Sequence, residues 1–544
     1  MDNIIEIKTV SFLDKIMPTA DFPPEENNGI LYKNSSLCFQ VAIKNQKIII
    51  DGAIKINTQL QKVQVQRVGY VPSNLPIREG HDSYLVDDKP GLYPDCLFDV
   101  NCDVVRLPMG INNVFLVTVD YYDGLLKGNY PIEITLLDKN ETIGKVLYVV
   151  NYTDLELEKP TEKYFNWIHY DSIAVLHNEK PFTKDYYAVF KEYLKLFKRG
   201  GANVLMVPLI TPPLDTHFNG ERFTTQLVKV VKKDGKYYFD FSLLSEFFDL
   251  VIKEGIEYFE FPPFFSQWGA KHAAKIIVEE NGVETSPFGW NSLALSNEYV
   301  EFLTSMLSAL SEFLQVRGYS DRCYFHISDE TDKYREHYLL CKKIVEDNLK
   351  GVHFIDAVTK AENLILNGGV QVLSISETVN VEDLSNIDAI YCCWGDYNNN
   401  LSNRFFCMPL ERTAVIWIQM YLNNAKYLLH WGFNFYQDYL SYNYVDPFAN
   451  SDVGGIFPSG DAFLVYPEVS KKKALSSIRL EALRYGKVIL ALLYTLEKLE
   501  SKEYVIQKLL SYGFKKYNEY PHSQGWLKNL ERDLYTDIAK RMEI

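Results

Sequence analysis

The first 155 residues alternate short apolar runs with turn-forming residues, a pattern typical of a β-rich domain. Asp-Gly and Gly-Asn pairs at 123–124 and 128–129 supply turn chemistry between two of these runs. Several short strands separated by turns predict an N-terminal β-sandwich over residues 1–155, followed by a polar linker over residues 156–164. The clearest strand candidates are residues 37–43, 63–70, 113–119, 130–137 and 144–150.

From about residue 165 the pattern changes to amphipathic helices that alternate with short apolar strands. In each expected helix, apolar residues recur at intervals of three and four, which places them on one face. Thr183 and Ser242 are expected to cap the first two helices, and glycines follow each helix end. The expected helices are residues 184–199, 243–254, 297–317 and 332–349. The expected strands are residues 165–169, 203–208, 256–261, 322–327, 352–355, 370–373, 389–393 and 427–431.

The repeated helix–glycine–strand units predict a parallel sheet with right-handed crossovers. Eight strands over roughly 280 residues predict a (β/α)8 barrel of the TIM type, placed at residues 165–500. The remaining residues, 501–544, predict a C-terminal helical extension packed on the barrel. A doubly wound open sheet is the alternative, but the sequence contains no GxGxxG or P-loop motif to support a nucleotide-binding version of it.

Charge and hydropathy exclude several classes of protein. The chain has 56 Lys plus Arg against 71 Asp plus Glu, a net charge of −15, which disfavours broad binding to nucleic acid. No stretch approaches 18 uncharged apolar residues, so no membrane span is expected. The first ten residues include Asp2 and Glu6 and lack a long apolar run, so they do not predict a secretory signal, and a cytoplasmic protein is expected.

Cysteines and aromatic residues narrow the chemistry further. The eight cysteines form no CxxC pair, and no Cys/His set has zinc spacing, so we expect free thiols and no metal site. Aromatic residues make up 14% of the chain. Core packing explains most of them, but rings also form the flat surfaces on which sugars stack, which makes the composition a hint toward carbohydrate.

Polar and aromatic side chains gather at or near the carboxyl ends of the predicted strands, where the active sites of such barrels lie. Rings and hydrogen-bonding groups together are the composition of a sugar pocket. Each residue also has a structural alternative: a buried ring at the barrel end, a satisfied histidine or a local cap. The substrate-binding candidates are His169, Asp215, Gln267, Trp268, His326, Tyr391, Trp394, Asn403, Arg404, Trp431 and Asn434.

The sharpest feature is the adjacent pair Asp329 and Glu330 after the fourth barrel strand. Two neighbouring carboxylates buried together repel each other, so one pKa rises, giving a protonated acid beside an ionised base. The alternative is that both acids begin a helix, where negative charge complements the helix dipole. The pair taken alone leaves both interpretations open.

Several ordered motifs over residues 165–490 resemble glycoside hydrolase family 123, which overlaps the domain of unknown function numbered 4091. They include HISDE at 326–330, which contains the acidic pair, and LHWGFNFY at 429–436. The other motifs are YDSIAV at 170–175, VPLITPPLDT at 207–216, FFSQWGA at 264–270, SNRFFCMPLERT at 402–413, GDAFLVYP at 460–467 and SIRLEALRYG at 477–486. The N-terminal sandwich also suits the family.

The resemblance implies a β-N-acetylgalactosaminidase that retains configuration by substrate-assisted catalysis, an exception to the scheme with an enzyme nucleophile. The catalytic pair of the family falls on Asp329 and Glu330. Glu330 would act as general acid and base, while Asp329 would orient the 2-acetamido group of the sugar. Apart from the resemblance, Tyr391 has two alternatives: a hydrogen bond to the acetamide oxygen, or a place in the core. The substrate would be a glycan or glycoconjugate, and no metal or organic cofactor is implied.

Three departures from the family pattern leave the acidic pair in place, and the second of them, at the expected pocket rim, bears on the preference for sugar or leaving group. Thr331 stands where related sequences often have proline, the pair Pro262-Pro263 precedes FFSQWGA, and residues 487–490 are apolar and basic rather than acidic. The alternatives are a glycosidase or transferase of the same fold acting on another glycan, and a non-catalytic carbohydrate-binding protein. Retention of both acids argues against a pure binder, which has no need of two adjacent carboxylates.

Overall fold

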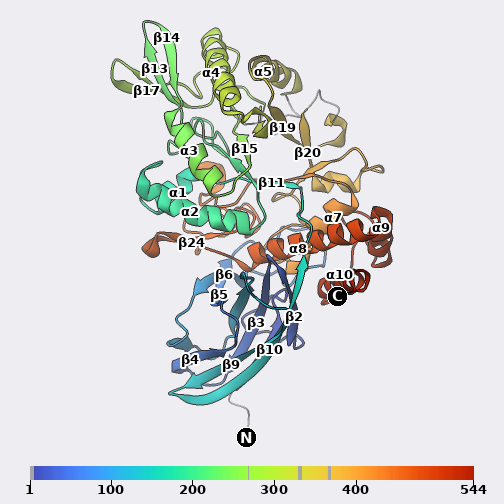
Figure 1. The fold of residues 1–544 in the computed structure, drawn as a ribbon. Helices are drawn as coiled ribbons and strands as arrows, with labels where there is room; N and C mark the ends of the chain where they lie inside the picture. Colours follow the sequence, from blue (N-terminus) through green and yellow to red (C-terminus); the bar gives the residue numbers. More distant parts are fainter. Residues whose placement is uncertain (1–4, 268, 329–333, 365–368, 544) are drawn as a thin grey trace.

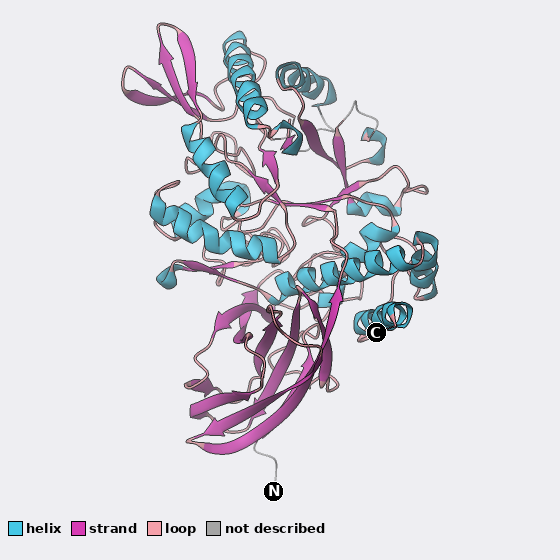
Figure 2. Cartoon of the chain, in the orientation of Figure 1, coloured by secondary structure: helices cyan, strands magenta, loops and turns pink. Residues whose placement is uncertain are grey.

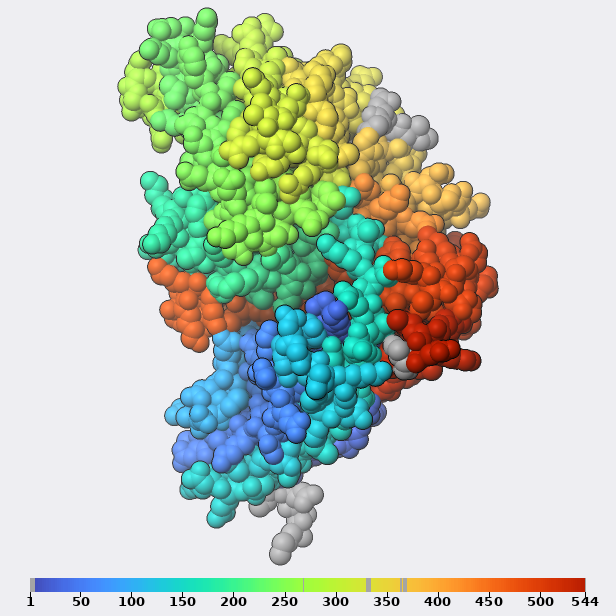
Figure 3. Space-filling model, in the orientation of Figure 1, coloured from blue at the N-terminus to red at the C-terminus, as the bar shows by residue number. Residues whose placement is uncertain are grey.

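The computed structural model of the chain describes residues 5–267, 269–328, 334–364 and 369–543. The N-terminal sheets lie at one end of the molecule and the parallel barrel with its helices at the other, with helix α8 (Ile478–Leu499) running between them (Figure 1). The space-filling view shows the same two lobes in direct contact (Figure 3). The barrel therefore packs against a second structural unit, formed by the N-terminal sheets.

Two five-stranded sheets form the N-terminal unit, in the orders β1-β3-β8-β5-β6 and β2-β10-β9-β4-β7. All neighbours are antiparallel except the parallel pair β2 and β10. The two sheets share one apolar core, in which Phe39 stacks on Tyr148 at 3.8 Å. The strands are β1 (Ile5–Ser11), β2 (Asn28–Lys33), β3 (Ser36–Asn45), β4 (Ile49–Asn57), β5 (Val63–Ser73), β6 (Gly91–Asp99), β7 (Val105–Leu107), β8 (Asn113–Asp120), β9 (Gly128–Asp138) and β10 (Glu141–Glu156).

Strand β8 shows why its sequence is almost continuously apolar. Phe115 and Val117 face the core between the two sheets, whereas Val114 and Leu116 on the opposite face join the larger core that includes the barrel. Because successive side chains of a strand point to opposite faces, a strand buried on both sides needs apolar residues at every position. The first sheet is therefore covered on its outer face by the rest of the molecule.

Eight parallel strands close into a barrel in the order β11-β12-β15-β18-β19-β20-β21-β22. These are the eight strands that the sequence predicts, in the predicted order. Their bounds are β11 (Lys163–Asn166), β12 (Val204–Met206), β15 (Tyr258–Phe261), β18 (Cys323–Phe325), β19 (His353–Val358), β20 (Val370–Ser374), β21 (Ala389–Tyr391) and β22 (Tyr427–His430).

Helices cover most of the outside of the barrel (Figure 2). The side chain of Thr183 caps α2 by accepting a hydrogen bond from the amide of Tyr186, as predicted. The prediction that Ser242 caps α3 is wrong, because Ser242 is already helical and its amide donates to the Asp240 carboxylate. The helices are α1 (Tyr170–Leu176), α2 (Lys184–Arg199), α3 (Ser242–Lys253), α4 (Asn297–Arg317), α5 (Arg335–Asn348), α6 (Leu410–Ala414) and α7 (Ile416–Leu422).

The connections between strands are less regular than eight repeated β/α units. Within the described ranges, the connections after β19 and β20 contain 3-10 turns at Ala361–Asn363 and Ile375–Val379 and no α-helix. Two hairpins, inserted after β12 and β15, pair into a four-stranded sheet that projects from the barrel (Figure 1). These strands are β13 (Lys229–Lys233), β14 (Lys236–Asp240), β16 (Ile276–Glu280) and β17 (Val283–Phe288). These strands were not predicted, because each has only five or six residues and lies in a connection between barrel strands.

The C-terminal helices complete the packing. Helices α9 (Lys502–Ser511) and α10 (Trp526–Met542) lie against α8, where the Tyr485 hydroxyl donates to the Glu531 carboxylate at 2.6 Å. The short strands β23 (Tyr466–Glu468) and β24 (Lys473–Leu475) precede α8. Arg479 of α8 forms a fully buried ion pair with Asp95 of β6 at 2.7 Å, which joins the N-terminal sheets to the barrel. None of the described helices combines the length and hydropathy needed to cross a bilayer.

Candidate active site

A cavity of about 280 Å³ opens at the carboxyl ends of the barrel strands. Its walls come from the segments that follow β11, β12, β15, β19, β21 and β22, so six of the eight strands contribute to it. This is the end at which barrel enzymes carry their active sites. The lining residues are Trp167, Leu214, Asp215, Gln267, Ala357, Thr359, Tyr391, Cys392, Cys393, Trp394, Leu429, Trp431, Tyr439 and Phe457. Five of the sequence-predicted residues are therefore brought together: Asp215, Gln267, Tyr391, Trp394 and Trp431.

The Trp431 ring is held in place by a buried acid. Its indole N–H donates to Asp461 Oδ2 at 2.8 Å, and Asp461 is fully buried. Burial raises the pKa of Asp461 to about 7, against the lowering effect of the nearby Arg404 and of the Trp431 hydrogen bond. The hydrogen bond therefore fixes the edge of the Trp431 ring at the cavity wall.

Trp394 contributes a second aromatic ring to the cavity lining. Its ring lies parallel to that of Phe457, with centroids 5.3 Å apart. The guanidinium of Arg78, from the segment after β5, lies 4.4 Å from the Trp394 ring centroid, within the range of a cation–π contact. The N-terminal unit thus reaches the rim of the barrel cavity and helps to hold one of its aromatic walls.

Tyr391 lines the cavity at the end of strand β21, and the buried Asp396 supports the turn that follows it. Burial raises the pKa of the Tyr391 phenol well above its usual value, against the lowering effect of hydrogen bonds with Thr359 and Ser374, so the hydroxyl stays neutral. Asp396 accepts a hydrogen bond from the Cys393 amide at 2.8 Å, and burial raises its pKa to about 6. Asp396 in this way fixes the turn that carries the cysteine and Trp394.

One wall of the cavity contains strained backbone. The Asp215 amide donates to the side-chain oxygen of Gln267, and Asp215 Oδ2 accepts from the Leu440 amide at 3.1 Å. Asp215, Leu440 and Ser441 have φ angles of 43°, 58° and 57°, in the left-handed region that non-glycine residues rarely adopt. Strain of this kind persists where surrounding contacts enforce it, and it concentrates at functional sites.

A buried polar network supports the floor of the cavity. Glu260 is fully buried, and its Oε1 accepts from Trp167 Nε1 at 2.9 Å and lies 2.5 Å from His326 Nε2. Asp356 Oδ1 accepts from the Ile327 amide at 2.9 Å and also from the next amide along the chain. His326 therefore lies in the interior of the barrel, and the network anchors the chain just before residue 329.

Four other predicted residues lie behind the walls rather than on the cavity surface. His169 Nε2 lies 3.0 Å from the carbonyl oxygen of Trp431, and burial lowers the pKa of His169 to about 3. Asn434 accepts from the His169 amide at 2.9 Å. Asn403 donates to the Cys393 carbonyl at 2.8 Å, and Arg404 donates to the carbonyls of Gly432 and Asp461. All four are buried and tie together the loops that carry the lining rings.

The remaining predicted residues, Trp268, Asp329 and Glu330, lie outside the described part of the chain. Sequence reasoning missed Thr359, Tyr439 and Phe457, which line the cavity but follow no expected strand directly. It also missed Asp461, although Asp461 lies within the GDAFLVYP motif.

The described residues include no group of three or more His, Cys, Asp or Glu side chains that could hold a metal ion. All eight cysteines are free, and Cys392 and Cys393 at the cavity have pKa values raised well above the usual thiol range by burial. Thiols in this state are protonated and poor nucleophiles. The described chemistry of the cavity is therefore that of aromatic stacking, neutral hydrogen bonding and carboxyl groups.

Comparisons with known proteins agree with this geometry. The family model described as glycoside hydrolase 123, catalytic domain, matches residues 167–496. A family 123 glycoside hydrolase from Clostridium perfringens, studied for glycolipid glycan hydrolysis, has the same fold with a TM-score of 0.73 at 14% identity, covering 99% of this chain and 98% of the other. A Bacteroides ovatus GH5 xyloglucanase aligns with a TM-score of only 0.30 at 9% identity, covering 85% and 98%. No curated protein matches the sequence.

Proposed function

The chain belongs to glycoside hydrolase family 123, and from this membership we propose that it removes terminal β-linked N-acetylgalactosamine from glycans with retention of configuration. The observation that carries the proposal is the cavity at the carboxyl ends of the barrel strands, lined by three tryptophans and a neutral tyrosine. The aromatic surfaces suit the apolar faces of a sugar ring, and the polar groups suit its hydroxyl and acetamide groups. A hydrolase acting at this end of the barrel agrees with the general rule for the fold.

In the proposed mechanism the substrate supplies its own nucleophile. The carbonyl oxygen of the 2-acetamido group attacks the anomeric carbon as the bond to the leaving oxygen breaks, and Glu330 donates a proton to that oxygen. Asp329 accepts the acetamide N–H and stabilises the positive charge of the oxazolinium ion that forms. Water, deprotonated by Glu330, then opens the ion and restores the acetamide. Two displacements at one carbon give retention.

These two roles rest on the family resemblance, and the described surroundings support them. Asp356 fixes the backbone amides of Ile327 and Ser328, at the end of the barrel where the cavity opens. We assign Trp431 as the stacking platform and Tyr391 as the partner of the acetamide oxygen. Gln267 and Asp215 are proposed to bind hydroxyl groups. His169, His326, Asn403, Arg404 and Asn434 are proposed to act indirectly, by holding the walls and floor.

We propose the corresponding domain division. The two N-terminal sheets would form a β-sandwich domain over residues 1–155, joined by a linker at 156–164 to a (β/α)8-type catalytic barrel over 165–500. Residues 501–544 would be an extension packed on the barrel. The shared core of the two sheets supports the first assignment, and the closed parallel barrel supports the second.

The proposal is tested with a chromogenic aryl β-N-acetylgalactosaminide. Wild-type protein is expected to release N-acetylgalactosamine, with the β-anomer appearing first in a time-resolved NMR spectrum. Glu330→Gln and Asp329→Asn should each lower kcat/KM by about 100-fold or more, since general acid–base catalysis contributes about 10²–10⁴-fold. Glu336→Gln is the matched control, because Glu336 is an exposed acid on α5.

Four results would each count against part of this account. Initial release of the α-anomer would exclude retention, and equal turnover by Glu330→Gln would remove Glu330 from the acid and base role. Binding of N-acetylhexosamines without cleavage by the wild type would favour the carbohydrate-binding alternative. A thiazoline mimic of the oxazolinium ion should inhibit competitively, whereas failure to inhibit would argue against participation of the acetamide.

A further inference from the structure

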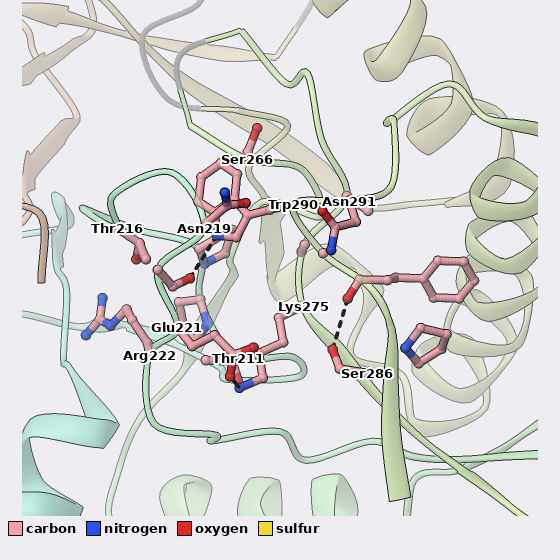
Figure 4. Close-up of a pocket in the computed structure, with 18 residues that line it drawn as sticks. Thr211, Thr216, Asn219, Glu221, Arg222, Ser266, Lys275, Ser286, Trp290 and Asn291 are labelled. Carbon is pink, nitrogen blue, oxygen red and sulfur yellow. Dashed lines mark hydrogen bonds and ion pairs between the residues drawn. The ribbon is translucent and has the colours of Figure 1, made fainter. Parts of the chain in front are cut away.

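A second cavity, of about 330 Å³, is lined in part by the sequence neighbours of residues that line the first. Figure 4 shows its lining side chains. One wall is the segment 211–222 after β12, and the other is the chain from Ser266 to Asn291, which includes the end of β17 in the inserted sheet. Its volume falls within the range of small-molecule sites, roughly 300–1,000 Å³. The insertion of hairpins into two neighbouring connections has therefore created a compartment that the barrel alone does not provide.

The second cavity has the side chains of a sugar site. The indole N–H of Trp290 donates to the Gly220 carbonyl at 2.8 Å, which fixes the ring at the cavity (Figure 4). The exposed ring of Phe218 packs edge-on against Trp290, with centroids 5.3 Å apart. The amides of Asn219 and Asn291 line the cavity and make no hydrogen bond to any residue that the structure describes. Their donors and acceptors are thus available to a ligand.

The charges at this cavity are internally balanced. Lys275 and Glu221, both in the lining, form an ion pair at 2.9 Å. Arg222, also in the lining, is buried and paired with Asp171 at 2.6 Å. No lining cation is therefore left to select an anionic group, and a ligand rich in neutral hydroxyl groups fits this surface better than a sulfated or carboxylated one.

The two cavities share their dividing wall. Leu214 and Asp215 line the first cavity, while the flanking residues Pro213 and Thr216 line the second. On the facing segment, Gln267 lines the first and Ser266 the second. The strained Asp215 backbone and its contact with Gln267 are thus the partition, and a ligand that extends past this wall enters the second cavity.

We propose that the second cavity is a saccharide subsite that binds an uncharged sugar of the same glycan, on the leaving-group side of the scissile bond. The inference rests on the proposed function, because a terminal sugar in the first cavity leaves the rest of the glycan to lie beyond it. Trp290 provides the stacking surface, and Asn219 and Asn291 provide the hydrogen bonds. The inserted four-stranded sheet then has a role in choosing which glycan is cleaved.

Binding is measured directly, so that the result does not depend on turnover. Fluorescently labelled neutral oligosaccharides of two to four sugars that lack N-acetylgalactosamine, with sialylated and sulfated counterparts, are titrated into the full-length protein. A neutral glycan should bind, and Trp290→Ala and Asn291→Ala should each weaken its Kd by about tenfold, in the range that stacking and single polar contacts contribute. Asn291 is exposed and makes no described hydrogen bond, so its variant tests binding without a folding defect.

Tyr238→Ala is the matched control, since Tyr238 is an exposed ring on β14 of the same inserted sheet and does not line the cavity. Its Kd should equal that of the wild type. Absence of binding by any neutral glycan, preference for charged glycans, or equal affinity in Trp290→Ala and Asn291→Ala would each overturn the proposal. Hydrolysis of the aryl glycoside needs no sugar on the leaving-group side, so it tests the proposed function independently of the subsite. Hydrolysis of the aryl glycoside without glycan binding would reject the subsite and leave the proposed function standing. Glycan binding without hydrolysis would support the subsite and reject the proposed function.

Discussion

Replacing Trp431 by phenylalanine isolates the hydrogen bond that pins the proposed stacking platform. Trp431→Phe keeps an aromatic ring but removes the N–H that donates to Asp461 at 2.8 Å. A hydrogen bond to a charged group contributes about 1.5–3 kcal/mol, and one pKa unit corresponds to about 1.4 kcal/mol. The loss should therefore raise the pKa of Asp461 by about one to two units above its value of about 7.

The sign of the pH effect follows from linkage. The pKa of Asp461 in the folded protein, about 7, lies above its unfolded value of 3.8, so folding favours the protonated acid. The stability that this group contributes is complete below about pH 4 and is lost as the pH rises through 7. In Trp431→Phe the pKa of Asp461 is higher, so this stability continues to fall up to a higher pH than in the wild type. The difference in unfolding free energy between variant and wild type should thus grow by about 1.5–3 kcal/mol between pH 5.5 and pH 9.

Urea unfolding at these two pH values measures that difference, and Trp417→Phe is the matched control. Trp417 lies in α7, outside the cavity, and its indole donates at 2.9 Å to the carbonyl of Leu483, which does not titrate. Its cost should be the same at both pH values. On the aryl glycoside, Trp431→Phe should lower kcat/KM by about tenfold, equivalent to about 1.4 kcal/mol, while Trp417→Phe stays near wild type. If the difference in unfolding free energy between Trp431→Phe and the wild type does not depend on pH, the assigned role of Asp461 is refuted. If kcat/KM of Trp431→Phe is unchanged, the proposal that Trp431 is the stacking platform is refuted.

Two further predictions concern the join between the N-terminal sheets and the barrel. Asp95→Asn leaves the fully buried Arg479 guanidinium without its counter-charge and should cost about 3–5 kcal/mol of unfolding free energy. The control is Asp138→Asn, at the exposed pair with Lys47, which should cost no more than about 1 kcal/mol. Similar costs for both variants would show that the buried pair is not required. Ion pairs with Arg199 and Arg484 lower the pKa of buried Glu481 to about 2, so its stabilisation is present above the unfolded pKa of 4.5 and is lost as the pH falls toward 2. Glu481→Gln should therefore reduce the difference in stability between pH 6 and pH 3, and an unchanged acid profile would contradict this assignment.

Local sequence patterns determined the elements of the barrel. Helices α2 and α4 begin and end where their apolar periodicity predicts, because the i, i+3 and i+4 spacing depends only on residues within one or two turns. Gly318 ends α4 in the left-handed conformation, with φ of 66°. The rule that active sites follow the carboxyl ends of barrel strands was enough to select Tyr391 and Trp431 before any contact was known.

Only the tertiary structure decided which of the candidates share a cavity and what holds them. Asp461 is 30 residues from Trp431 along the chain, and nothing in either local sequence indicates that the two are bonded. The contact of Arg78 with Trp394 and the second cavity beside the inserted sheet depend likewise on segments far apart in sequence. The periodicity of the sequence shows which face of a helix or strand is apolar. It does not show which other element packs against that face. The packing of the whole chain decides which elements meet. It therefore also decides which residues line the cavity and which hold the lining residues in place.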